Sequence, residues 1–127
     1  MIIGVPKEIK ISENRVGLTE AGVMQLTREG HTVYIEKDAD LGSGITNEQY
    51  EKYGAKILPS KNEIYAKAEM IVKVKEPLPE EYELLKEEQS LFTYLHLAAE
   101  PELTKQLMRK KIKSIAYETI ENPNGSL

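Results

Sequence analysis

The sequence predicts an α/β domain with a mostly parallel, five-stranded sheet that helices cover on both faces. Two observations favour this fold class. Short β-rich runs alternate with segments of helical pattern along the chain, and 127 residues suit one domain with a hydrophobic core. Because crossovers between parallel strands are right-handed, a flavodoxin-like strand order 2-1-3-4-5 is the expected topology.

Five segments have the apolar or alternating composition of strands. The first is short and ends before Pro6, which cannot donate a ladder hydrogen bond. The fourth is the most concentrated apolar and aromatic run of the chain, typical of a buried strand. The predicted strands are residues 2–5, 31–36, 70–74, 90–95 and 113–119, and residues 55–58 form a further short extended piece.

Capping residues and prolines mark the expected helices between these strands. Thr19 can cap a helix that continues to about Glu29, with Gly30 as its stop. Ser60 can cap a second helix that continues to Ala68. The remaining predicted helices are residues 47–53, 79–86 and 101–111.

Composition excludes several classes of function. Net charge is −4 with interspersed signs, which argues against a nucleic-acid surface. The absence of cysteine excludes disulfides and thiolate metal sites, and two histidines, His31 and His96, argue against a multi-histidine metal site. No apolar stretch approaches the ~20 residues of a membrane span, and the start lacks a signal-peptide layout. A cytoplasmic protein without nucleic-acid or membrane partners is therefore expected.

Charged side chains follow several of the predicted strands. Arg15 lies in the loop after the first strand, Lys75 ends the third, His96 follows the fourth and Glu118 ends the fifth. In a parallel sheet the carboxyl ends of the strands meet at one edge, where α/β proteins bind ligands. Because the first, third and fourth strands are neighbours in the expected order, Arg15, Lys75 and His96 are predicted to converge.

Each of these residues has a functional and a structural interpretation. The planar fork of Arg15 suits a carboxylate, but the residue could be a solvated loop charge. Lys75, predicted by strand alternation to share a face with Lys73, could hold a substrate oxygen or only solubilise the strand end. His96 could be a general acid and base or a hydrogen-bonded structural histidine. Glu118 alone is a faint electrostatic signal.

The glycine-rich segment 42–44 gives no sign of a dinucleotide site. It lacks the third glycine of the fingerprint and does not follow the first strand. A flexible turn is the simpler interpretation, and no other segment supplies the fingerprint.

A set of short segments spread along the chain forms a recognisable pattern. They are 4–9 (GVPKEI), 14–16 (NRV), 18–19 (LT), 42–44 (GSG), Tyr50, 54–55 (GA), 72–77 (VKVKEP), 92–98 (FTYLHLA) and 116–119 (AYET). Together, in this order and along essentially the whole chain, they resemble the start of bacterial alanine dehydrogenases. One difference is Glu20, where proline is usual, at a helix first-turn position that should not affect function.

The resemblance implies an enzyme that uses NAD for the reversible oxidative deamination of L-alanine to pyruvate and ammonia. It implies that Arg15 binds the substrate carboxylate, that Lys75 holds a carboxylate or carbonyl oxygen, and that His96 is the acid and base. Tyr94 is implied to contribute to substrate binding, and Glu118 to lie near the site.

The resemblance also implies the organisation of the protein. Residues 1–121 would be the N-terminal substrate and catalytic domain, and residues 122–127 would begin a linker to a Rossmann domain that binds NAD. On this view the 127 residues alone are inactive, and the complete enzyme is a homo-oligomer, a hexamer in the family. The alternatives are a non-catalytic binding or assembly module, and part of a transhydrogenase-like NAD(P) subunit, which His96 disfavours.

Overall fold

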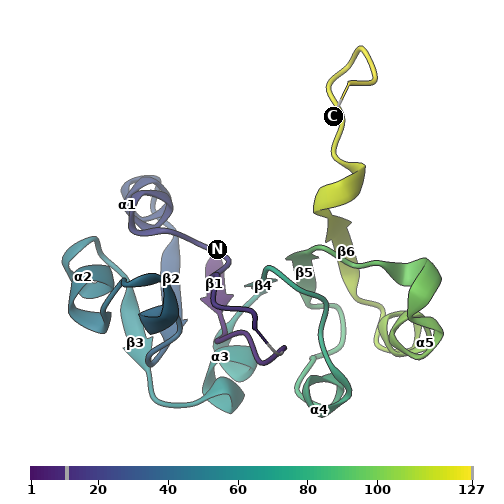
Figure 1. The fold of residues 1–127 in the computed structure, drawn as a ribbon, viewed down its shortest axis with the longest axis horizontal. Helices are drawn as coiled ribbons and strands as arrows, with labels where there is room; N and C mark the ends of the chain where they lie inside the picture. Colours follow the sequence, from purple (N-terminus) through teal and green to yellow (C-terminus); the bar gives the residue numbers. More distant parts are fainter. Residues whose placement is uncertain (11, 127) are drawn as a thin grey trace.

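The structure, a computed structural model, describes residues 1–10 and 12–126 and contains a six-stranded sheet (Figure 1). The strand order is β3-β2-β1-β4-β5-β6, and every neighbouring pair is parallel. The strands are β1 (Ile2–Val5), β2 (Thr32–Glu36), β3 (Lys56–Leu58), β4 (Met70–Val72), β5 (Ser90–Thr93) and β6 (Lys113–Ala116).

The predicted fold class is confirmed, and the strand count of five is wrong by one. The short extended piece predicted at residues 55–58 pairs with β2, where Tyr34 lies opposite Lys56, and it forms one edge of the sheet as β3. A three-residue strand with an exposed first residue has little apolar signal of its own. The other five strands lie in the expected order 2-1-3-4-5.

Five α-helices cover the sheet, with α1 on one side and α3, α4 and α5 on the other (Figure 1). Thr19 and Ser60 cap α1 and α3 as predicted, by accepting hydrogen bonds from the backbone N–H groups of Gly22 and Glu63. The helices are α1 (Glu20–Arg28), α2 (Asn47–Lys52), α3 (Lys61–Lys67), α4 (Pro79–Tyr82) and α5 (Pro101–Arg109), with 3₁₀ turns η1 (Leu41–Ser43), η2 (Leu97–Ala99) and η3 (Tyr117–Thr119).

Each face of the sheet has its own hydrophobic core. One core joins Val23 of α1 and Tyr50 of α2 to the sheet residues on their side. The other joins the buried side chains of α3, α4 and α5, among them Tyr65 and Leu103, to Ile71 of β4 and to the adjacent strands. Neighbouring residues of β4 point to opposite cores, as strand geometry requires.

Several elements are shorter than predicted, and three of them are strands that end early at the carboxyl edge of the sheet. The helix predicted to reach residue 86 ends at Tyr82, and the strands predicted to end at residues 74, 95 and 119 end at Val72, Thr93 and Ala116. Beyond Val72 the backbone–backbone hydrogen bonds of the chain go to the β5 segment, because its other neighbour, β1, has ended at Val5. The residues beyond these strand ends form loops and the 3₁₀ turn η3 at this edge. No helix within the described ranges has the length and apolar character to cross a membrane.

Candidate active site

The carboxyl edge of the sheet carries all five residues that the sequence predicts for the site. Arg15 lies in the loop after β1, Lys75 in the loop after β4, Tyr94 and His96 after β5, and Glu118 in η3 after β6. These four strands are consecutive neighbours in the sheet, so their carboxyl ends form one continuous row. The structure therefore brings the five residues to one edge.

Arg15 is exposed and already holds one carboxylate. Its Nη2 lies 2.7 Å from Glu13 Oε1, and its Nε lies 2.8 Å from Glu13 Oε2. This ion pair raises the pKa of Arg15 and lowers the pKa of Glu13, and the charge of Lys75 lowers the pKa of Glu13 further. Lys75 is thus close enough to the pair to interact with it electrostatically, and the Nη1 end of the Arg15 fork faces away from Glu13.

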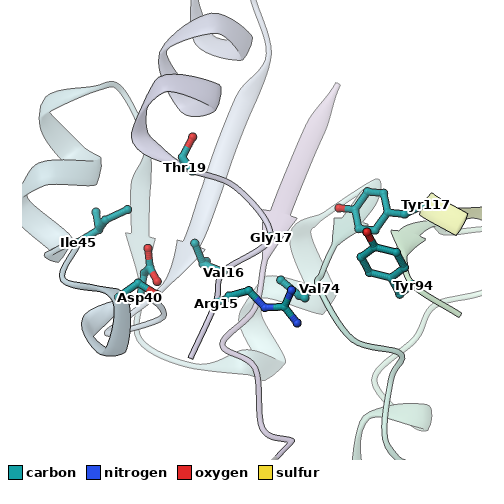
Figure 2. Close-up of a pocket in the computed structure, with 10 residues that line it drawn as sticks. Arg15, Val16, Gly17, Thr19, Asp40, Ile45, Val74, Tyr94 and Tyr117 are labelled. Atoms are coloured by element: carbon teal, nitrogen blue, oxygen red, sulfur yellow. The ribbon is translucent and has the colours of Figure 1, made fainter. Parts of the chain in front are cut away.

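A pocket of about 530 Å³ opens beside Arg15. The guanidinium points across it toward Tyr94 and Tyr117, and Asp40 lies on the opposite side (Figure 2). The volume is in the range of small-molecule sites. Burial raises the pKa of Tyr117 to about 12, so this phenol stays neutral and can act as a hydrogen-bond donor. The pocket can accept a small ligand with an anionic end toward Arg15.

His96 has an exposed side chain and an unusual backbone conformation. Its φ is +51°, in the left-handed region that non-glycine residues seldom adopt. The imidazole stacks on Tyr94, with ring centroids 6.2 Å apart and an interplanar angle of 16°. Within the described part of the chain the ring takes part in no hydrogen bond, so the interpretation of His96 as a hydrogen-bonded structural histidine is not supported.

Lys75 and Lys73 do not share a face, contrary to the prediction from strand alternation. β4 ends at Val72, and Lys73 turns inward, where its side chain is 1% exposed and lies 3.5 Å from Glu8 and 3.3 Å from Glu81. Lys75 is half-buried. Alternation fails here because the ladder has ended and buried carboxylates attract the nearer lysine.

Each of the two loops that carry Lys75 and His96 has a carboxylate whose pKa is lowered. Burial raises the pKa of Glu76, but the hydrogen bond from Lys10 and the charge of His96 lower it more, and the net shift is downward. Burial likewise raises the pKa of Glu118, while backbone hydrogen bonds from His96 and Leu95 lower it more. The charge of His96 thus acts on Glu76, the residue that follows Lys75.

Four residues of this edge were missed by the sequence analysis: Glu8, Glu13, Asp40 and Tyr117. Glu8 and Glu13 lie in a charged loop that the sequence predicts to be exposed to solvent. Glu8 is nevertheless buried, and it accepts hydrogen bonds from the backbone of Val74 and Lys75, more than 60 residues away along the chain. Asp40 is 2% exposed, and its Oδ1 has no hydrogen-bond partner among residues 1–10 and 12–126. Burial raises the pKa of Asp40. Local sequence carries no signal for such long-range pairings.

The glycine-rich turn at residues 42–44 packs closely against the segment that carries Arg15. A Cβ on Gly42 would lie 2.8 Å from Asn14 Oδ1, and Ser43 Oγ donates a hydrogen bond to the Asn14 carbonyl oxygen. The glycine-rich turn is therefore used for packing against the Arg15 loop. The described ranges also contain no cluster of three or more metal-ligating side chains.

Comparison with known proteins gives a consistent result. Residues 4–127 match the family described as alanine dehydrogenase/PNT, N-terminal domain. The chain is 61% identical over 127 residues to an alanine dehydrogenase of Methanococcus maripaludis and covers 34% of that protein. It is 58% identical over 120 residues, 94% of this chain, to an alanine dehydrogenase of Bacillus subtilis and covers 32% of it. The chain thus spans about a third of the length of these relatives.

Two solved structures have the same fold. An L-alanine dehydrogenase superposes with a TM-score of 0.95 at 55% identity, over 99% of this chain and 35% of that one. A transhydrogenase from Sinorhizobium meliloti superposes with a TM-score of 0.86 at 25% identity, over 93% of this chain and 35% of that one.

Proposed function

The chain belongs to the alanine dehydrogenase/PNT N-terminal domain family, and on this premise we propose that it is the substrate-binding part of an NAD-dependent L-alanine dehydrogenase. The observation that carries the proposal is the row of Arg15, Lys75 and His96 at the carboxyl edge of the sheet. Two cations suit a carboxylate with an adjacent carbonyl, and an exposed imidazole suits proton transfer near neutral pH.

Each side chain has a defined task in this proposal. Arg15 binds the carboxylate of alanine or pyruvate through the Nη1 end of its fork, because Glu13 occupies the Nε edge. Lys75 holds a carboxylate or carbonyl oxygen of the substrate. His96 accepts and returns the protons of water addition and ammonia release, and Tyr94, stacked on its ring, forms the adjacent wall.

The proposal extends to the whole protein. In the complete enzyme, NAD held by a separate domain would accept the hydride. Residues 1–121 would form the substrate and catalytic domain, and residues 122–127 would begin the linker to an NAD-binding domain. We further propose that the complete enzyme is a cytoplasmic homo-hexamer and that this chain alone is inactive.

His96→Ala in the full-length enzyme is the direct test. We expect kcat for alanine oxidation to fall by about 10² to 10⁴-fold, the usual contribution of general acid–base catalysis, while KM changes little. His31→Ala is the matched control, because His31 immediately precedes β2 and its ring contacts the chain N-terminus instead. Steady-state kinetics measures both variants, and full activity of His96→Ala would refute the acid–base role.

The structural similarity to a transhydrogenase supports a second candidate, hydride exchange between nicotinamide nucleotides. Alanine-dependent NADH formation by the full-length protein favours the first candidate, and NADPH-dependent reduction of an NAD analogue without alanine favours the second. A protein with neither activity that still binds pyruvate in calorimetry would be a binding module.

A further inference from the structure

We infer that Glu8 and Glu118 are paired positioning residues, each of which fixes the backbone of one loop of the site without contacting substrate. Glu118 fixes the loop that carries His96, and Glu8 fixes the loop that carries Lys75. The inference rests on the proposed function for its kinetic consequences and on geometry alone for its structural ones.

Glu118 binds two successive backbone N–H groups at the end of β5. Its Oε1 accepts hydrogen bonds from Leu95 N at 3.0 Å and from His96 N at 3.0 Å. These are the residues at which the chain leaves the sheet and His96 takes a positive φ. A charged acceptor shared by both N–H groups favours this conformation over extended backbone.

Glu8 does the same at the end of β4. Its Oε2 accepts from Val74 N at 3.2 Å, its Oε1 accepts from Lys75 N at 3.0 Å, and Lys73 Nζ lies 3.5 Å from Oε1. Glu8 is buried, and its pairing with Lys73 compensates its charge. The backbone of Lys75 is therefore held directly by a side chain from the β1 loop.

The sheet order explains why two carboxylates can do this. β1 is the neighbour of β4 on one side, and β6 is the neighbour of β5 on the other. Each neighbour supplies a carboxylate from its own carboxyl end to the N–H groups of the loop beside it. The loop of β4 thus donates hydrogen bonds to one flank and the loop of β5 to the other. The positions of Lys75 and His96 relative to each other are in this way fixed in advance of binding.

The oxygens used differ between the two carboxylates, and this difference gives a sharp test. Oε1 of Glu118 accepts a 3.0 Å hydrogen bond from both N–H groups, and Oε2 adds only a longer, 3.4 Å contact with Leu95 N, so glutamine can keep the two short bonds through its carbonyl oxygen. Glu8 uses both oxygens, so glutamine must present a donor amide to one of the N–H groups. In the full-length enzyme, Glu118→Gln should retain most activity, whereas Glu118→Ala should not.

Kinetics of alanine oxidation and pyruvate reduction should separate the two residues. We expect Glu118→Ala to lower kcat by about tenfold or more with a small change in KM, because it displaces the residue proposed to transfer protons. Glu8→Gln should mainly raise KM for pyruvate, because it displaces the proposed substrate-binding lysine. Glu121→Ala, which removes an exposed carboxylate three residues from Glu118, is the matched control and should leave both constants unchanged.

Hydrogen exchange tests the structural part without reference to activity. Glu118→Ala should increase amide exchange in residues 94–97 and leave β1 protected. Glu8→Gln should increase amide exchange in residues 73–76. The inference would be overturned if Glu118→Gln and Glu118→Ala lost the same amount of activity. It would also be overturned if amide exchange stayed unchanged in residues 94–97 of Glu118→Ala and in residues 73–76 of Glu8→Gln. If the wild-type enzyme does not oxidise alanine, the proposed function fails, and exchange still decides the positioning role. Because Glu118 is exposed, its variants remain informative even if Glu8→Gln does not fold.

Discussion

Glu13 determines which edge of Arg15 a ligand can reach. The Nε edge is filled by an intramolecular carboxylate, so a substrate carboxylate must approach the Nη1 end. A guanidinium can serve two carboxylates at once because its five donors point in fixed directions. A lysine ammonium at the same position would have to divide a single charge centre between Glu13 and the substrate.

Arg15→Lys is therefore not a conservative change at the proposed site. We expect KM for pyruvate to rise by about tenfold or more, as expected for loss of a charge-assisted hydrogen bond, with a smaller effect on kcat. Initial-rate kinetics of the full-length enzyme measures this. Arg28→Lys, at the exposed end of α1, is the control and should behave as wild type. An unchanged KM in Arg15→Lys would show that the fork has no part in binding the carboxylate.

At the residue scale, the sequence predicts where the proposed site residues lie better than it predicts the groups that support them. Arg15, Lys75 and His96 can be found because each follows a recognisable strand, and parallel topology then places them at one edge. Glu8 cannot be found in this way, because its burial depends on N–H groups near residue 74 that no local pattern connects to it.

At the element scale, helix starts are predictable because a cap is a local interaction. Thr19 and Ser60 cap the helices that the sequence assigns to them. Strand ends at the carboxyl edge are not predictable in the same way, because they depend on where the neighbouring strand stops. The predicted strand 70–74 ends at Val72 since β1 no longer accompanies it, and 113–119 ends at Ala116, where η3 begins.

The most complete cap in the chain belongs to α2. Thr46 accepts a hydrogen bond from Gln49 N at 3.2 Å, and Gln49 Oε1 accepts one from Thr46 N at 2.7 Å, which is a capping box. We expect Thr46→Ala to lower the free energy of unfolding by about 1 kcal/mol. Urea denaturation measures the change. Glu51→Ala, at an exposed position later in α2, should have an effect within about 0.5 kcal/mol, and an equal loss in both variants would argue against the cap.

At the scale of the whole molecule, a buried ion cluster lies beneath the proposed site. Lys73 joins Glu8 from the loop after β1 to Glu81 of α4, and Tyr65 of α3 donates a 2.7 Å hydrogen bond to Glu81. Burial, reinforced by the Glu81 charge, raises the pKa of Tyr65 well above its usual value, so the phenol remains a donor. The cluster thus ties the sheet to two helices of one layer.

Lys73→Met tests what this cluster contributes. Two buried carboxylates would then lie near each other without their shared cation, and breaking a buried pair in this way typically removes about 3–5 kcal/mol from the free energy of unfolding. Lys56→Met, at an exposed position of β3, is the matched control and should change stability by about 0.5 kcal/mol or less. Because Glu8 also holds the Lys75 loop, the folded fraction of Lys73→Met should show a raised KM for pyruvate. If Lys73→Met keeps wild-type stability, other groups compensate the charges of Glu8 and Glu81. Lys73 would then not be needed to hold Glu8, and with it the Lys75 loop, against α4.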